Sequence, residues 1–127
     1  MTILEGNYTE AIDCLVRSIR LCYELGHKQF VATGLGSLSY AVGLRGEPEP
    51  VLASIYSARI GGAAESLLDR IGLTPWTKTN SLAQLARQFI RSRVDEESYK
   101  AAWAEGRALT IEQAVDLACQ VASGVST

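Results

Sequence analysis

The residue types that most often carry out chemistry are few in this chain and are not spaced for it. His27 is the single histidine, and the sequence offers no group that would position its ring for acid–base catalysis. Glu96 and Glu97 are adjacent, so on a helix their carboxylates point in different directions and suit a helix N-terminus better than a general acid and base. The cysteines are too scattered for the ligand pairs of a zinc site: Cys14, Cys22 and Cys119.

Glycine motifs for nucleotide binding are incomplete. The run Gly34-Leu35-Gly36 lacks the rest of the dinucleotide fingerprint, and no predicted strand precedes it. The sequence contains no GxxxxGK[ST] phosphate loop. We therefore expect no enzyme activity, no metal and no cofactor.

A single basic cluster stands out, formed by Arg87, Arg91 and Arg93. Arg87 and Arg91 are four residues apart and share one face of a predicted helix. Two interpretations stay open. The arginines form a solvated helix face, or they form a docking patch for an acidic segment of a partner.

The composition is that of one globular domain. The chain has 127 residues, of which 47% are apolar and 20% charged, which is enough for a sizeable core. A net charge of −2 argues against a nucleic-acid partner. No apolar run reaches membrane-spanning length, and the first residues lack a signal-peptide pattern. We therefore expect a cytoplasmic protein with reduced cysteines and no membrane partner.

Apolar residues recur at intervals of three and four, which predicts an all-α protein of five or six helices without strands. One predicted helix begins at Pro48 or Pro50 and ends before Gly72, with a weak point at Gly61-Gly62. The next has Leu85, Phe89 and Ile90 among its apolar positions. Its start lies at Thr74 or at residues 79–81. The remaining helices are predicted over residues 7–26, 27–44, 95–106 and 110–122.

The first two units of the chain look alike. Gly6 precedes a helix with Tyr8 and Ala11, and Gly46, which lies 40 residues later, precedes a helix with Ala58. A period of this size with two helices per unit is typical of a helical solenoid. The small residues would let paired helices cross closely. The tyrosines are expected at helix–helix seams with their hydroxyls reaching water.

At these residues the chain resembles the tetratricopeptide-repeat family. The stretch GNYTEAIDCLVRSIRLCYELG is similar to the second helix of such a repeat, and GLGSLSYAVGLRGEPEP is similar to the first helix of the next. The resemblance implies antiparallel hairpins stacked as a short right-handed solenoid. It implies one domain over residues 1–127, with repeat-like units at 1–26 and 27–72, closing helices at 73–122 and a frayed tail at 123–127.

A second resemblance lies in the last third of the chain. ARIGGAAESLLDRIG followed by AAWAEGRALTIEQAVDLA is similar to the closing helical segment of LuxR-type and related signal-transducing ATPase regulators. The stretch GEPEPVLASIYSARIGG is longer than that family usually has. Within AAWAEGR, Trp103 is expected to lock its short helix against the preceding one, and Arg107 is expected to pair with an acid.

The resemblances imply a non-enzymatic module that binds protein or peptide, or senses a signal, in or beside a bacterial transcriptional regulator. The residues expected to contact a partner are Thr33, Ser37, Tyr40, Arg87 and Arg91. Two other functions remain possible. The first is a homodimer, formed through an apolar N-terminal hairpin face that lacks a preceding helix. The second is a sensor that binds a small molecule between helices.

Overall fold

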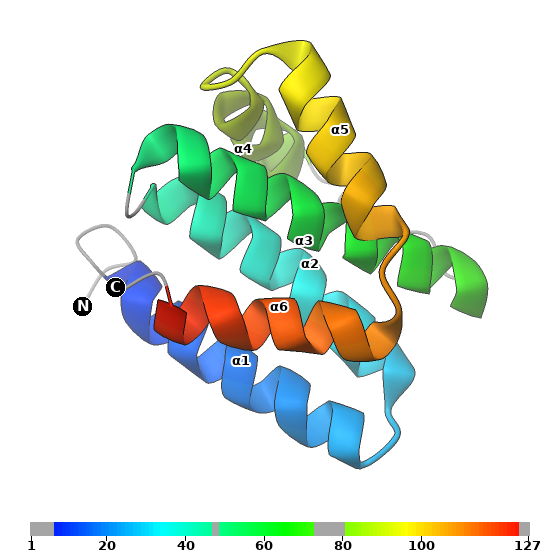
Figure 1. Ribbon diagram of the computed structural model, residues 1–127. Coiled ribbons are helices and arrows are strands. Elements are labelled where there is room, and N and C mark those ends of the chain that lie inside the picture. The colour runs from blue at the N-terminus through cyan, green and yellow to red at the C-terminus, as the bar shows by residue number, and fades with distance from the viewer. Residues whose placement is uncertain (1–6, 47–48, 73–80, 125–127) are drawn as a thin grey trace.

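The protein is all-helical in the part that the computed structural model describes, residues 7–46, 49–72 and 81–124 (Figure 1). This part contains six helices and no strand, as the sequence predicts. The helices are α1 (Asn7–Glu24), α2 (Lys28–Arg45), α3 (Pro50–Ile71), α4 (Ser81–Arg91), α5 (Glu96–Arg107) and α6 (Ile111–Gly124). None of them is both long and apolar enough to cross a bilayer.

The helix ends follow local sequence signals. Gly26, Gly46 and Gly72 follow α1, α2 and α3 with φ angles of 79°, 72° and 88°, a left-handed conformation that glycine adopts without steric cost. The Glu49 side chain accepts a hydrogen bond from the Leu52 amide at 3.0 Å. This cap places the start of α3 at Pro50, the second of the two predicted positions.

Three glycines lie inside α3 and α5. Gly61 and Gly62, the predicted weak point, do not break α3, which is one continuous helix from Pro50 to Ile71. Gly106 lies in the last turn of α5, which ends at Arg107, one residue beyond the predicted end. All three glycines are buried where α3 and α5 cross, so they serve close packing between helices.

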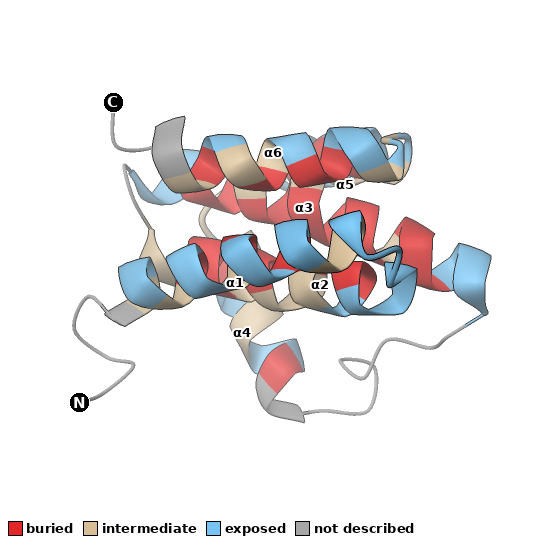
Figure 2. Cartoon of the chain, turned by 90° about the horizontal axis from the view of Figure 1, so that it is seen from below, coloured by how far each residue is buried: buried red, intermediate tan, exposed pale blue. Residues whose placement is uncertain are grey.

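The arrangement is built around α2 and α3. Helix α1 packs on α2, α5 crosses α3 on the opposite side, and α4 lies beside α2 and α3 (Figure 1). Helix α6 returns along α1 and also contacts α2 and α3. The main core therefore draws buried residues from α1, α2, α3 and α6, as the red inner faces in Figure 2 show. A second cluster joins α3, α4 and α5 around Ala58, Ile90, Tyr99 and Ala102.

The packing of α6 on α1 changes the expected surface of the N-terminal unit. The homodimer alternative assumes that this apolar face is open, whereas Ile12 and Ile19 are each 1% exposed within the core that α6 shares. On α1 and α2, the large apolar side chains that are exposed lie near the turn between the two helices: Leu21, Leu25 and Phe30. In an open solenoid each helix contacts only near neighbours in the chain, whereas here the first and last helices meet.

Helix α4 docks through a face that its apolar pattern indicated only in part. Leu85 and Phe89 are 64% and 55% exposed, although both were among its predicted apolar positions. Ile90, the third of these predicted positions, is buried together with Ala83. Arg87 lies four residues after Ala83 and is half-buried on this inward side. The docking of α4 therefore carries a cation into the space between the helices.

Candidate functional site

A cavity of about 380 Å³ opens beside α3, α4 and α5. Four cations, one carboxylate and two aromatic rings line it, although the whole chain has a net charge of −2. The lining residues are Glu65, Arg87, Arg91, Tyr99, Lys100, Trp103, Ala104 and Arg107. This cavity therefore concentrates positive charge on a protein that is slightly acidic overall.

Arg87 is held by hydroxyl groups from three other helices. Its Nη1 donates to Ser57 Oγ and to the Tyr99 hydroxyl, each at 3.1 Å, and its Nη2 donates to Ser39 Oγ at 3.0 Å. Ser39 lies on α2, Ser57 on α3 and Tyr99 on α5. These neutral acceptors fix the guanidinium in place without neutralising its charge.

The two serines are oriented by each other. Ser39 Oγ donates to the Ser57 carbonyl and Ser57 Oγ donates to the Ser39 carbonyl, both at 2.6 Å, and both side chains are fully buried. A hydroxyl has one proton, so each oxygen has only acceptor lone pairs left for a further partner. The pair thereby presents two acceptors, 3.1 Å apart, to the Arg87 guanidinium.

Aromatic rings flank the arginines. The Arg87 guanidinium carbon lies 4.3 Å from the centre of the Tyr40 ring and 5.2 Å from that of Trp103. Arg91 lies 4.9 Å from the Tyr99 ring centre. Cation–π contacts of this kind stabilise a guanidinium that has lost part of its water. They also leave the edge of the planar group as the route by which an anion can approach.

The cations of the cavity differ in their counterions. Arg91 pairs with Glu96 at 2.6 Å. Arg107 pairs with Glu65 at 2.5 Å and with Asp69 at 3.0 Å. Within residues 7–46, 49–72 and 81–124, no carboxylate forms an ion pair with Arg87 or Lys100. A half-buried charge without a counterion is costly, so Arg87 is the group in this cavity that an anionic ligand would stabilise most.

The pKa shifts of the groups beside this cavity result from the same contacts. Burial raises the pKa of Tyr99, although Arg87 opposes the shift, so its hydroxyl is neutral at physiological pH. The hydrogen bond from Arg91 holds the pKa of Glu96 below its usual value. Bonds to Asp69 and Glu65 raise the pKa of Arg107. The acids beside the cavity are therefore satisfied by Arg91 and Arg107, and not by Arg87.

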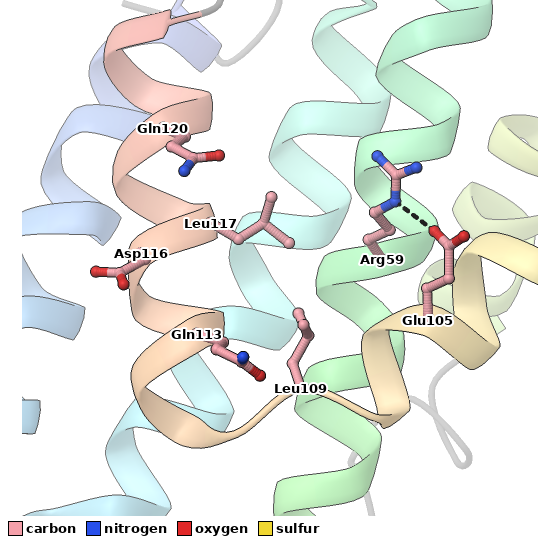
Figure 3. Close-up of a pocket in the computed structure, with 7 residues that line it drawn as sticks. All are labelled: Arg59, Glu105, Leu109, Gln113, Asp116, Leu117 and Gln120. Atoms are coloured by element: carbon pink, nitrogen blue, oxygen red, sulfur yellow. Dashed lines mark hydrogen bonds and ion pairs between the residues drawn. The ribbon is translucent and has the colours of Figure 1, made fainter.

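A second cavity, of about 370 Å³, lies beside α3, α5 and α6 (Figure 3). Its cation is already paired, because Arg59 Nε donates to Glu105 Oε1 at 2.8 Å. Its Gln113 side chain accepts from the Thr110 amide at 2.9 Å and so caps α6. The remaining lining residues are Leu109, Asp116, Leu117 and Gln120. This cavity has no cation like Arg87 and is the weaker candidate.

The structure brings together three of the five residues expected to contact a partner. Tyr40, Arg87 and Arg91 lie in or against the first cavity. Thr33 is exposed on α2, where its hydroxyl donates to the Gln29 carbonyl at 2.9 Å. Ser37 is half-buried on α2, and neither it nor Thr33 bonds to the arginines among the described contacts.

The residues expected to act structurally fall in several places. Gly6 lies outside the described residues, while Tyr8 and Ala11 are half-buried on α1. Ala58 is fully buried on α3. Trp103 lies against Gly61 of α3, and its Nε1 donates to Glu65 at 3.0 Å. Gly46 caps α2, and Arg107 pairs with two acids of α3.

Sequence reasoning missed Ser39, Ser57, Tyr99 and Lys100 as parts of the site. The sequence gave only a weak indication of the two serines. Each lies among apolar residues of its helix, which indicates a buried hydroxyl. The Tyr99 hydroxyl was expected to reach water and instead accepts from Arg87. Within the described residues, no group of three or more His, Cys, Asp or Glu side chains is placed to hold a metal.

Comparison with known proteins does not assign the chain to a family. No protein-family model matches the chain, and neither the curated proteins nor the solved structures contain a significant match. The class that the fold and cavity define is therefore an all-helical protein with a cationic, aromatic-flanked cavity.

Proposed function

We propose that this chain is a non-enzymatic helical module that binds an acidic segment of a partner protein. The observation that carries the proposal is the placement of Arg87, half-buried and without a carboxylate partner in the described structure, in a cavity that three further cations line. Complementary charge gives such a surface both its specificity and its rate of encounter with a partner. Of the two interpretations of the arginine cluster, this arrangement favours the docking patch.

The architecture supports an interaction role. Helix α1 packs on α2 and α2 packs on α3, and neighbour-to-neighbour packing of this kind is compatible with the proposed repeat-like architecture. The resemblance of the last third to signal-transducing ATPase regulators suggests that the segment belongs to a bacterial regulator. The three cysteines are thiols, which suits the cytoplasm.

Binding of a defined peptide tests the proposal. The probe is a fluorescent decapeptide of alternating glutamate and serine, acetylated and amidated so that only side chains carry charge. We expect the full chain to bind it about tenfold or more tightly than the same peptide with glutamine at every glutamate. Equal affinity for the two peptides would reject the proposal.

A charge-matched variant separates the cavity from general attraction. Arg20 lies exposed on α1, outside the cavity, so Arg20→Gln removes the same charge as Arg87→Gln. The acidic peptide should lose affinity with Arg87→Gln and keep it with Arg20→Gln. Equal losses would indicate non-specific electrostatics.

A small-molecule sensor is a second candidate, because the volume of the cavity lies within the range of ligand pockets. A ligand that binds only the folded state raises the melting temperature. Thermal shifts with a panel of small dicarboxylates would favour this function if they exceed those produced by the acidic peptide.

A homodimer is a third candidate and rests on a different surface. Leu21, Leu25 and Phe30 are 57%, 62% and 54% exposed near the turn between α1 and α2. Apolar side chains gathered in this way mark surfaces of association. Sedimentation at increasing concentration, with Leu25→Glu as the disrupting variant, tests whether this patch joins two copies.

A further inference from the structure

The hydrogen bonds of Arg87 define which part of its guanidinium is open to a ligand. A guanidinium carries five N–H groups, and the bonds to Ser57, Tyr99 and Ser39 use both protons of Nη1 and one of Nη2. Among the described residues, no acceptor bonds to Nε or to the second proton of Nη2.

These two remaining donors lie on one edge. The Ser39 and Ser57 oxygens are 3.1 Å apart and receive Nη2 and Nη1, so they occupy the end of the guanidinium fork. The Nε–H and the outer Nη2–H then point in parallel along the side of the group. Two parallel N–H donors match the two oxygens of a carboxylate in a bidentate contact.

The surroundings of this edge favour one carboxylate over a neutral ligand. Tyr40 and Trp103 lie against the guanidinium and limit how far it can turn. Lys100 lines the same cavity, and no ion pair joins it to a carboxylate of the described residues. A ligand carboxylate would thus replace lost water at Arg87, and the charge of Lys100 adds to the attraction that an acidic segment meets at this cavity.

We infer that Arg87 binds the carboxylate of an aspartate or glutamate side chain through its Nε–H and Nη2–H edge, with Ser39 and Ser57 as positioning residues. The inference rests on the proposed function for the source of the carboxylate, a protein segment. It adds the atom pair that makes the contact and the reason why arginine, and not lysine, stands at this position.

The Nε–H resonance of Arg87 reports this contact directly in nitrogen–proton correlation spectra of the full chain. The probe is a single glutamate residue acetylated and amidated at its ends, and its control is the same compound made with glutamine. We expect the glutamate probe to shift the Arg87 Nε–H signal and leave that of Arg20 unchanged. No shift at Arg87 at saturating probe would overturn the inference, and this arm needs no substitution that endangers folding.

The second arm compares Arg87→Lys with Arg20→Lys in binding the glutamate–serine decapeptide. Both keep the charge, but Arg87→Lys loses the planar fork, so its affinity should fall about tenfold while Arg20→Lys binds as the original chain does. An Arg87→Lys variant that folds and binds equally well would overturn the inference.

The two proposals fail in different ways. Decapeptide binding without any Arg87 shift would retain the proposed function and reject the carboxylate contact. A shift with the single glutamate, together with no preference for the acidic decapeptide over its glutamine form, would retain the contact and reject the partner segment. A phosphoserine form of the single-residue probe that shifts Arg87 more than glutamate does would reject a carboxylate as the preferred anion.

Discussion

Gly106 of α5 packs directly against the backbone carbonyl of Arg59 on α3, so closely that a β-carbon at this position would overlap it. Gly62 of α3 meets the Trp103 carbonyl of α5 in the same way. Two of the three helices that line the first cavity, α3 and α5, therefore touch backbone to backbone. This contact fixes Trp103 and Tyr99, which α5 carries, relative to α3.

Replacing Gly106 by alanine should consequently separate the helices. The added methyl group has backbone and not a flexible side chain as its neighbour, so we expect Gly106→Ala to destabilise the protein by about 1–3 kcal/mol in urea unfolding. Gly36→Ala is the matched control. Its β-carbon would lie 4.0 Å from Ala64, so helix propensity should leave it neutral or stabilise it by up to about 1 kcal/mol. Similar losses for both variants would contradict the close crossing.

The Ser39–Ser57 pair supplies a second prediction. Ser39→Ala removes the proton that satisfies the Ser57 carbonyl and one of the oxygens that hold Arg87. Because these groups are buried, we expect a loss of about 1–3 kcal/mol by chemical unfolding. The double variant with Ser57→Ala should cost less than the sum of the single variants. Thr33→Ala, at an exposed hydroxyl that bonds only its own helix, should stay within about 0.5 kcal/mol of the original.

The packing of α6 on α1 leads to a third prediction. Ile12 is buried in the core that α1 shares with Ala118 and Val121 of α6. Ile12→Ala should destabilise the whole protein by about 2–5 kcal/mol in a single cooperative transition. Leu85→Ala, at an exposed position of α4, is the control and should change stability by no more than about 0.5 kcal/mol. An Ile12→Ala chain that unfolds in two separated steps would indicate that α1 is a separate unit.

The ends of the helices could be predicted because their signals are local. Glycine at a left-handed position and the reciprocal bonds of Thr110 and Gln113 each involve residues no more than five apart. These features need no tertiary context, and so Gly26, Gly46 and Gly72 end helices where the sequence indicates.

The site could be predicted only in part, because it depends on which face of α4 points inward. The apolar side chains of Leu85 and Phe89 suggested one face, but the small Ala83 lets α4 dock through another and turns Arg87 inward. The serine partners of Arg87 are 48 and 30 residues away in the chain, on two other helices. A pattern within one helix carries no information about contacts of that range.

The ion pair between Arg107 and Glu65 gives a fourth prediction. Glu65 accepts from Arg107 at 2.5 Å and from Trp103 at 3.0 Å, which ties α5 to α3 on the side of the cavity. A double-mutant cycle with Glu65→Gln and Arg107→Gln should give a coupling energy of about 0.5–1 kcal/mol, small because both side chains are partly exposed. Urea unfolding at low and high salt measures it, and a coupling that salt does not reduce would contradict an electrostatic origin.

The N-terminal cap of α5 makes the stability of the protein depend on pH in the acidic range. Asp95 accepts hydrogen bonds from the amide and the hydroxyl of Ser98 at 3.0 and 2.8 Å, and these bonds lower its pKa. The folded pKa thus lies below the unfolded one, so the carboxylate stabilises the fold fully above the unfolded pKa and loses this effect as pH falls through the folded pKa. Asp95→Asn should therefore lower the melting temperature at pH 7, with a difference that shrinks below about pH 4. Ser98→Ala removes the hydroxyl donor, so the stabilising effect of Asp95 should be lost at a higher pH than in the original chain. A melting difference between Asp95→Asn and the original chain that is the same at pH 7 and at pH 3 would show that the charge of Asp95 contributes nothing to the cap.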